Sequence, residues 1–346
     1  MTLLNLRHLL PSVREHREVE KKVLLLLEET LEQGYLKPTR LPINPLRYAQ
    51  RNVFSILFLA IYQAIGIPAE RRLLYGVINH AIRGIVTGTD NLLDDEYKEM
   101  LPLKFPEQAT RFKSVMHILL FDRFLFRVMD EAVLLGMLET EQRQLVQQKI
   151  FQAMVPIGGE EATEEGGVHD ILSPEAILES VHVHKGGNLL QLAFVAPRMI
   201  EKDCFSALEE ADQGIFRIGM ALQVIDDLTD FYQDIADRRH NYLVSSVRFE
   251  GTAVEQQRLE ELLTGAEGTQ PVEGIFRESV ERVMHRAVGE ALAGFTQLEK
   301  AGFWLGNRDA LRLIRYLFRL RGVGQLLSLW PADNRFVMTL EAGDDP

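Results

Sequence analysis

The chain has 346 residues, of which 46% are hydrophobic and 25% are charged, an ordinary composition for a soluble protein with a large core. Its net charge of −12 and the lack of any long basic run argue against nucleic-acid binding. The single cysteine, Cys204, excludes an intramolecular disulfide framework. The longest apolar stretch, residues 53–67, is shorter than the ~20 residues that span a bilayer, so we expect a cytoplasmic protein without a transmembrane segment.

Apolar residues recur at helical spacing along most of the chain, and alternating runs typical of strands hardly occur. The segment 157–173, rich in glycine and glutamate, is predicted to be a loop. We expect an all-α protein. The spacing predicts helices over residues 12–33, 47–65, 69–88, 107–135, 139–155, 174–197, 205–234, 252–264, 272–300 and 308–329.

The first acidic motif follows an apolar helix, where Asp90 and Asp94 lie one turn apart and share a face. Two carboxylates placed in this way repel each other unless a cation lies between them. Hard oxygen ligands suit Mg²⁺, which usually binds one or two carboxylates together with phosphate oxygens of a substrate. The alternative is an exposed acidic helix end, which the helix dipole disfavours slightly.

A lysine followed by two glycines comes next, within a helical pattern at Lys185, Gly186 and Gly187. Glycine allows a backbone or a ligand to approach closely. The lysine is a candidate for contact with a phosphate. His182 and His184 point to different faces of a helix, so we expect them to pack or to support the site instead of chelating a metal.

The second acidic motif is the stronger signal. Asp226, Asp227 and Asp230 fall within one turn of an otherwise largely apolar helical segment, residues 215–232. Unpaired carboxylates buried there would cost much free energy or would stay protonated. A bound metal ion removes this difficulty, and we therefore interpret the motif as a metal site.

The order of these motifs resembles the trans-isoprenyl diphosphate synthases, the polyprenyl synthetase family of class I isoprenoid synthases. That family carries a first DDxxD motif, a lysine followed by small residues, and an F-Q-x-x-D-D-x-x-D motif. The matching segments are Asp90-Asn91-x-x-Asp94, Lys185-Gly186-Gly187 and Leu222-Gln223-x-x-Asp226-Asp227-x-x-Asp230. The resemblance covers about residues 46–247 and identifies the chain as a divergent member.

The resemblance implies one large helical bundle with a central active-site cavity, formed by a single domain. We expect this domain to comprise N-terminal helices and a loop over 1–45, a core over 46–247, C-terminal helices over 248–330 and a tail over 331–346.

The implied reaction is the Mg²⁺-dependent ionisation of an allylic prenyl diphosphate, with three ions bound together with the diphosphate. Physically this is metal stabilisation of a leaving group. The resemblance assigns metal binding to Asp90, Asp94, Asp226 and Asp230, and catalysis to Asp90, Asp94, Asp226 and Lys185. Lys185 and Gln223 are expected to contact the allylic diphosphate, and Arg239 stands near another diphosphate-binding position of the family.

The chain departs from the family where isopentenyl diphosphate should bind. The early Gly-Lys-Arg segment is missing, and only Arg47 and Arg51 stand near its place. Arg83 replaces a histidine seven residues before the first motif, and Asn91 replaces the second aspartate of that motif. Because arginine binds phosphate well, Arg47, Arg51 and Arg83 are candidates for a rebuilt cradle.

Three functional interpretations remain open from the sequence. The favoured one is an active class I isoprenoid synthase, either a prenyltransferase that also uses isopentenyl diphosphate or a terpene synthase that cyclises or hydrates a single substrate. The second is a catalytically impaired subunit that regulates an active partner. The third is a helical interaction protein whose acids are only surface groups. A homodimer is compatible with all three.

Overall fold

The computed structural model describes residues 9–38, 44–94, 97–266, 268 and 270–326. These residues are mostly helical, and their only β pairing is an isolated bridge between Leu36 and Leu103. The predicted all-α class is confirmed. The chain divides into two compact units, the first formed by Met1–Phe151 and Leu192–Leu208, the second by Gln152–Gln191 and Glu209–Pro346. The single domain and the central cavity stay predictions.

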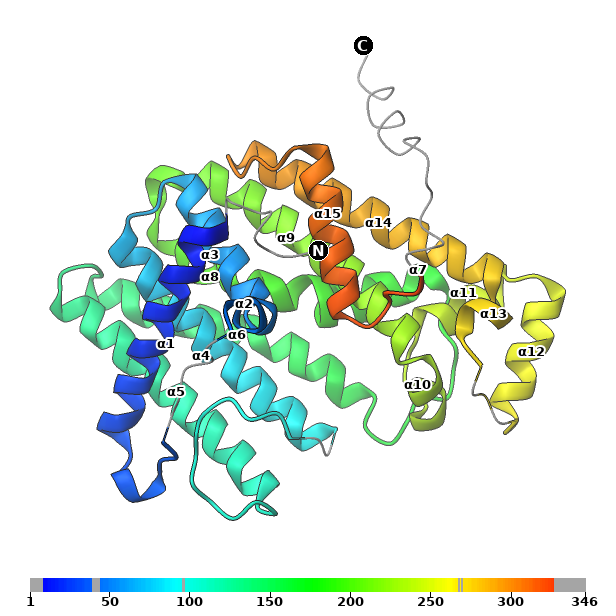
Figure 1. The fold of residues 1–346 in the computed structure, drawn as a ribbon, viewed down its shortest axis with the longest axis horizontal. Helices are drawn as coiled ribbons and strands as arrows, with labels where there is room; N and C mark the ends of the chain where they lie inside the picture. The colour runs from blue at the N-terminus through cyan, green and yellow to red at the C-terminus, as the bar shows by residue number, and fades with distance from the viewer. Residues whose placement is uncertain (1–8, 39–43, 95–96, 267, 269, 327–346) are drawn as a thin grey trace, which may run out of the picture. The chain divides into compact units, whose positions relative to one another are not determined.

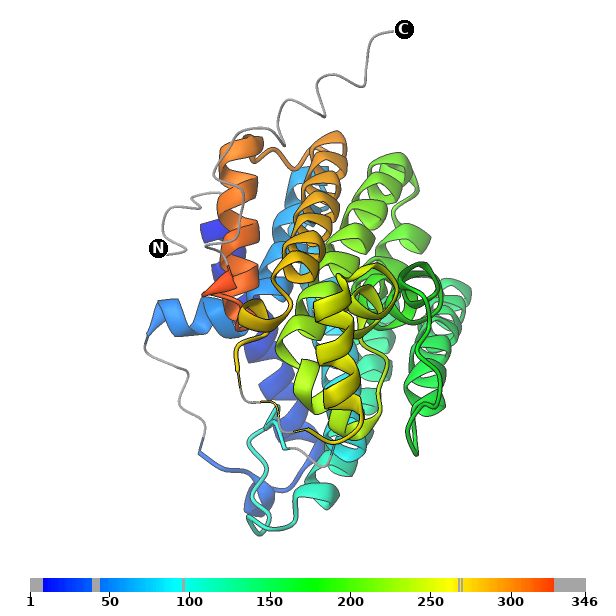
Figure 2. The same cartoon turned by 90° about the vertical axis from the view of Figure 1, so that its right-hand side faces the viewer.

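In the first unit, helix α4 packs along α5 and α1, and α1 also packs against α3 (Figures 1 and 2). Buried aliphatic and aromatic side chains fill the contacts between these helices. The unit contains α1 (Leu10–Thr30), a 3₁₀ turn (Gln33–Tyr35), α2 (Pro45–Arg51), α3 (Val53–Ile65), α4 (Ala69–Leu93), α5 (Thr110–Leu134), the first half of α6 (Thr140–Thr163) and most of α8 (Leu189–Ile200).

The second unit is built around α9 and α14, and α15 packs against α14 (Figure 1). It begins with the second half of α6, followed by α7 (Pro174–Ala176) and the π-helix η4 (Ile177–Asn188), and α9 (Phe205–Thr229) lies in it from Glu209 onward. The remaining helices are α10 (Phe231–Asp237), α11 (Tyr242–Glu250), α12 (Ala253–Leu263), α13 (Val272–Ile275), α14 (Arg277–Lys300) and α15 (Gly306–Leu320).

Helix α9 is held by close backbone contacts on two sides. A methyl group at Gly186 of η4 would lie 2.6 Å from the carbonyl oxygen of Gly219. A methyl group at Gly294 of α14 would likewise lie 2.7 Å from the carbonyl oxygen of Gly214. Only glycine permits such an approach. These contacts fix the helix that carries the second acidic motif.

Some predicted boundaries were wrong. Helix α6 continues through Pro156 to Thr163 instead of ending before a loop, although an internal proline and the glycines at 158 and 159 disfavour a helix; near its end Glu161 pairs with Lys185. The segment predicted as 47–65 is two helices, broken at Asn52, and the segment predicted as 205–234 is broken at Asp230. Helix α11 was missed because it is short; the side chain of Asn241 caps its start.

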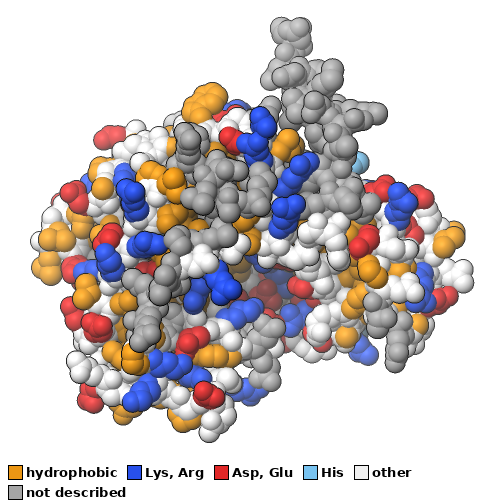
Figure 3. All heavy atoms as spheres, in the orientation of Figure 1, with side chains coloured by type: hydrophobic (Ala, Val, Ile, Leu, Met, Phe, Trp, Pro, Cys, Tyr) orange, Lys and Arg blue, Asp and Glu red, His pale blue; other side chains and the backbone are white. Residues whose placement is uncertain are grey.

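Charged side chains of both signs are interspersed with hydrophobic ones on the face shown in Figure 3. Among the described residues, no helix combines the length and the apolar character needed to cross a membrane.

Candidate functional site

The first acidic motif lies at the C-terminal end of α4, in the first unit. Asp90 is half-buried in the last turn of the helix, and the exposed Asp94 follows its end. The backbone N–H of Asp94 donates to the carbonyl oxygen of Asp90 at 2.9 Å, so the helical turn between the two acids is intact. This geometry agrees with the expectation that both carboxylates lie on one face of the helix.

Asn91, which departs from the family motif, has a structural role. Its side chain is buried, and its amide nitrogen donates to the carbonyl oxygen of Lys98 at 3.1 Å. The backbone N–H of Lys98 donates in return to Asn91 Oδ1 at 2.9 Å. An amide side chain can make both bonds, whereas a carboxylate can only accept. Asn91 therefore holds the backbone of Lys98, which follows the motif, against the end of α4.

Two of the three arginines predicted to bind isopentenyl diphosphate lie together. Arg83 donates to Asn52 Oδ1 and to the carbonyl oxygen of Arg51, each at 3.0 Å. The guanidinium of Arg51 donates to the carbonyl oxygen of Glu99 at 3.0 Å. Arg47 is exposed on α2. Arg51 and Arg83 are thus engaged by protein oxygens in this structure.

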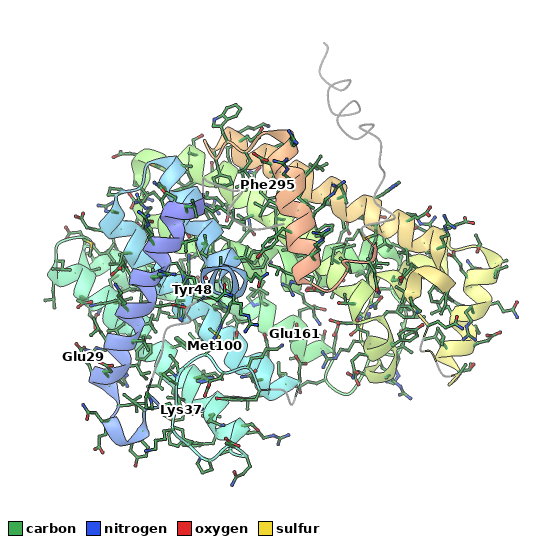
Figure 4. The ribbon with its side chains drawn as sticks, viewed as in Figure 1. Glu29, Lys37, Tyr48, Met100, Glu161 and Phe295 are labelled. Atoms are coloured by element: carbon green, nitrogen blue, oxygen red, sulfur yellow. The ribbon has the colours of Figure 1, made fainter. Side chains whose placement is uncertain are left out.

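These arginines lie beside a buried polar network on α1 and α2. Burial lowers the pKa of Arg83, the nearby Arg51 lowers it further, and Glu20 opposes both effects. Burial also raises the pKa of Glu20, although hydrogen bonding to Tyr48 acts in the other direction. Tyr48, labelled in Figure 4, is bonded to His16 Nδ1 at 2.7 Å. The network therefore holds one carboxyl group close to two guanidinium groups.

The second acidic motif opens onto a cleft of about 760 Å³ within the second unit. Asp226 lies in the last turn of α9 and is partly buried, whereas Asp230 follows the helix end and is exposed. Thr229 Oγ1 donates to the Asp226 carbonyl oxygen and to Asp230 Oδ1. The polar residues that line the cleft include Asp226, Asp230, Tyr232, Glu273 and Arg321.

Asp226 is in an unfavourable position for a lone negative charge. Burial raises its pKa to about 7, and the carboxylates of Asp230 and Asp227 act in the same direction. Only Arg321 opposes them, with its Nη1 at 2.8 Å from Asp226 Oδ2. The cleft thus presents a carboxylate that a cation stabilises.

Asp227, the middle acid of the motif, is buried and has a structural role. Its carboxylate accepts from His182 Nε2 at 2.9 Å, from the backbone N–H of Tyr242 at 2.5 Å and from Gln223 Nε2 at 3.1 Å. Asp227 therefore joins η4, α9 and α11. His182 supports this acid, in line with the expectation that the two histidines do not chelate together. Gln223, predicted to contact diphosphate, donates to Asp227 in this structure.

Lys185 is paired with two glutamates from the segment that was predicted to be a loop. Its Nζ lies 2.7 Å from Glu164 and 3.2 Å from Glu161, which Figure 4 labels on α6. Burial acts to lower the pKa of Lys185, but the two glutamates outweigh it and leave the pKa above its usual value. The lysine is therefore charged, and its charge is neutralised from within the unit.

Asp234 is an acid that the sequence reasoning missed. Burial raises its pKa to about 7, while a hydrogen bond from Asn241 opposes the shift. Arg239, predicted to bind diphosphate, also lowers the pKa of Asp234, and its backbone N–H donates to the Asp234 carbonyl oxygen at 2.8 Å. The signal was available in the sequence, since Asp226, Asp230 and Asp234 recur at intervals of one helical turn.

The residues at this cleft fit Mg²⁺ in part. In the described part of the chain, no three His, Cys, Asp or Glu side chains are grouped to hold a metal by themselves. Mg²⁺ commonly takes only one or two carboxylates and completes its shell with water and phosphate oxygens. Asp226 and Asp230 are such a pair, and the raised pKa of Asp226 reflects a charge that a cation would balance.

Comparisons with solved structures identify the architecture. Octaprenyl pyrophosphate synthase from Helicobacter pylori matches with a TM-score of 0.58 and 14% identity, covering 88% of this chain and 98% of that one. Geranylgeranyl pyrophosphate synthetase from the archaeon Geoglobus acetivorans matches with a TM-score of 0.58 and 15% identity, covering 89% and 98%. The chain has the polyprenyl synthase fold.

A third structure with the polyprenyl synthase fold is the polyprenyl synthase from Caulobacter crescentus, complexed with calcium and isoprenyl diphosphate. It matches with a TM-score of 0.54 and 14% identity, covering 90% of this chain and 96% of that one. No protein-family model and no curated protein matches the sequence. The polyprenyl synthase fold is therefore established here by structure.

Proposed function

We propose that the chain is a divergent trans-isoprenyl diphosphate synthase, a Mg²⁺-dependent enzyme that ionises an allylic prenyl diphosphate and transfers the prenyl group. The observation that carries the proposal is the pair Asp226 and Asp230, which opens onto a cleft in a chain with the polyprenyl synthase fold. A cytoplasmic location accompanies this proposal as a prediction.

In this proposal the carboxylates of Asp226 and Asp230 hold Mg²⁺, and Asp90 and Asp94 supply a second pair of carboxylates. Bound Mg²⁺ stabilises the negative charge that develops on the leaving diphosphate. Lys185 supplies a further positive charge to the diphosphate. To do so, it leaves its ion pairs with Glu161 and Glu164.

A terpene synthase that uses no isopentenyl diphosphate is the second candidate. The observation that favours it is the state of Arg83 and Arg51, whose guanidinium groups already donate to oxygens of Asn52, Arg51 and Glu99. A prenyltransferase must turn these groups toward a second diphosphate. A terpene synthase has no such requirement.

One assay separates the candidates. The purified chain is incubated with Mg²⁺ and geranyl, farnesyl or geranylgeranyl diphosphate, each with and without isopentenyl diphosphate, and extracted products are identified by mass spectrometry. Elongated products that need isopentenyl diphosphate support the transferase. Cyclic or hydroxylated products from one substrate support the terpene synthase. No product with any substrate, together with no release of diphosphate, would contradict both and favour a non-catalytic subunit.

The Arg83→Ala variant sharpens the distinction. In a transferase it should raise the concentration of isopentenyl diphosphate required for half-maximal rate by about 10-fold, the usual effect of losing one charged phosphate contact, and should leave slow ionisation of the allylic substrate intact. A terpene synthase uses no isopentenyl diphosphate, so in that case the same variant should leave the rate of ionisation of the allylic substrate unchanged. Arg14→Ala, at an exposed position of α1, is the matched control.

We also propose that the chain forms a homodimer through α5. Four apolar side chains are exposed along one stripe of this helix, opposite its buried face: Phe112, Val115, Leu119 and Phe126 are 51%, 40%, 58% and 43% exposed. Three of them repeat at intervals of seven residues, a spacing that lets a helix pack against a second copy of itself. Leu119→Glu should yield a monomer in analytical ultracentrifugation, whereas Phe249→Glu on α11 should not.

A further inference from the structure

Arg321 and Asp226 form an ion pair between parts of the second unit that are far apart in the sequence. Arg321 Nη1 lies 2.8 Å from Asp226 Oδ2, and the two side chains are 41% and 20% exposed. Both line the same cleft, with Asp230 and Glu273 on its wall. The guanidinium of Arg321 thus pairs with the carboxylate that the proposed function assigns to Mg²⁺.

The chain around Arg321 is shaped to place this side chain at the end of α9. Arg321 follows α15, and its backbone N–H donates to the carbonyl oxygens of Leu317 and Phe318. Gly322 then adopts a φ of 94°, the left-handed conformation that ends many helices. A methyl group on Gly322 would lie 3.3 Å from the Thr229 side chain, between the two acids. The buried side chain of Val323 anchors the turn.

We propose that Arg321 is the resident counter-ion of Asp226, which Mg²⁺ must displace, and that this displacement makes metal binding depend on diphosphate. The proposal rests on the proposed function, since it assigns Asp226 to the metal. Mg²⁺ would be held by the same carboxylate at short range, so it would compete with the guanidinium for Asp226.

The displaced guanidinium needs a new anion. Of the two other carboxylates on the cleft wall, Asp230 is itself assigned to the metal, and Glu273 offers the guanidinium a single alternative partner. A diphosphate that arrives with the metal offers oxygens in a geometry that arginine recognises well. Diphosphate therefore favours Mg²⁺ binding, because it accepts the displaced guanidinium. Mg²⁺ favours diphosphate binding in turn, because it releases that guanidinium from Asp226. Arg321 acts here as a positioning residue that prevents the cleft from retaining Mg²⁺ in the absence of substrate.

The test is the affinity for Mg²⁺, measured by isothermal titration calorimetry on the full chain, first alone and then with saturating inorganic diphosphate. In Arg321→Gln, Mg²⁺ alone should bind roughly 5-fold more tightly, the size expected for loss of a partly exposed ion pair. The enhancement of Mg²⁺ affinity by diphosphate should fall by at least about 5-fold. Arg321→Lys keeps the charge and should lie between wild type and Arg321→Gln.

Arg312→Gln is the matched control, because Arg312 belongs to the same helix and pairs with Asp309 at 2.7 Å. It should behave as wild type in both titrations. Unchanged affinity and unchanged enhancement in Arg321→Gln, in a protein that binds Mg²⁺ with diphosphate, would overturn the role of Arg321 alone. Absence of Mg²⁺ binding in wild type, even with diphosphate, would overturn this inference and the proposed function together.

Discussion

Asn91 and Asp227 hold the second place in the two acidic motifs, one in each unit of the chain. Asn91 binds both the N–H and the C=O of Lys98 and so fastens the segment after α4. Asp227 accepts from the N–H of Tyr242 and from His182, and so fastens the start of α11. Both side chains are buried. An amide in one motif and a carboxylate in the other thus perform the same structural task.

The comparison changes the meaning of the departure at position 91. Judged by the motif alone, asparagine in place of aspartate looks like the loss of a metal ligand. In the structure this position faces the following backbone, and the outer acids Asp90 and Asp94 are retained. In the second motif the outer acid Asp226 pairs with Arg321.

The largest expected effect concerns the outer acids. If both motifs hold Mg²⁺, Asp90→Ala and Asp226→Ala should each lower turnover by at least about 10²-fold, or about 3 kcal/mol of barrier, while leaving the helical content unchanged. Release of diphosphate from the allylic substrate measures the rate, and circular dichroism checks the fold. Asp203→Ala, at an exposed position away from both motifs, is the control. Near-full activity in both variants would refute the metal assignment.

The second prediction concerns Asp227 and Asn91, the residues at the second place of each motif. Asp227→Ala should lower the free energy of unfolding by about 3 kcal/mol, because it leaves the buried groups of His182 and Tyr242 without their partner. Asn91→Ala should cost about 1–2 kcal/mol. Asn91→Asp, which restores the family motif, should also lose stability and gain no turnover. Urea unfolding provides the values, and a faster Asn91→Asp enzyme would contradict the structural role of Asn91.

A smaller effect is expected in the first unit, where His16 should make the stability depend on pH. Burial lowers the pKa of His16 from 6.5 to about 3, with a further contribution from Arg83. Between these values the unfolded chain binds more protons than the folded protein, so stability falls as the pH falls. At pH 5 this amounts to about 2 kcal/mol. His16→Asn, which keeps a partner for Tyr48, should show a shallower loss between pH 7 and pH 5 in urea unfolding; a parallel curve would exclude His16 as the cause.

The smallest expected effect is that of Lys185. Lys185→Ala should slow release of diphosphate by roughly 10-fold, and by more than Lys98→Ala or Lys104→Ala, which alter exposed lysines after the first motif. Equal small effects in the three variants would mean that Lys185 only pairs with Glu161 and Glu164. His182→Ala should mainly lower stability, because its ring supports Asp227.

Helical periodicity was enough to predict the all-α class and most helices, since each carries a continuous apolar face. It could not predict that α6 continues past Pro156, because the glycines and glutamates beyond the proline show no apolar face. Motif spacing likewise found Asp226 and Asp230, which share a turn. It could not find Arg321 or Glu164, whose contacts join segments far apart in the sequence. Nor could it distinguish Asp227, which faces inward, from its neighbours.

The glycine contacts of α9 determine which parts of the second unit can yield when a ligand enters. Gly219 meets Gly186, and Gly214 meets Gly294, with carbonyl oxygens where methyl groups would otherwise lie. At both crossings the backbones are in direct contact, and the side chains of Gln223, Ile218 and Leu298 pack beside them, so sliding or rotating the helix would force its neighbours apart. The carboxylate of Asp226 is therefore carried by a closely packed helix. Adjustment to an arriving ligand must come from the segments beyond the helix, and a mutation that stiffens them should slow binding while leaving the acid in place.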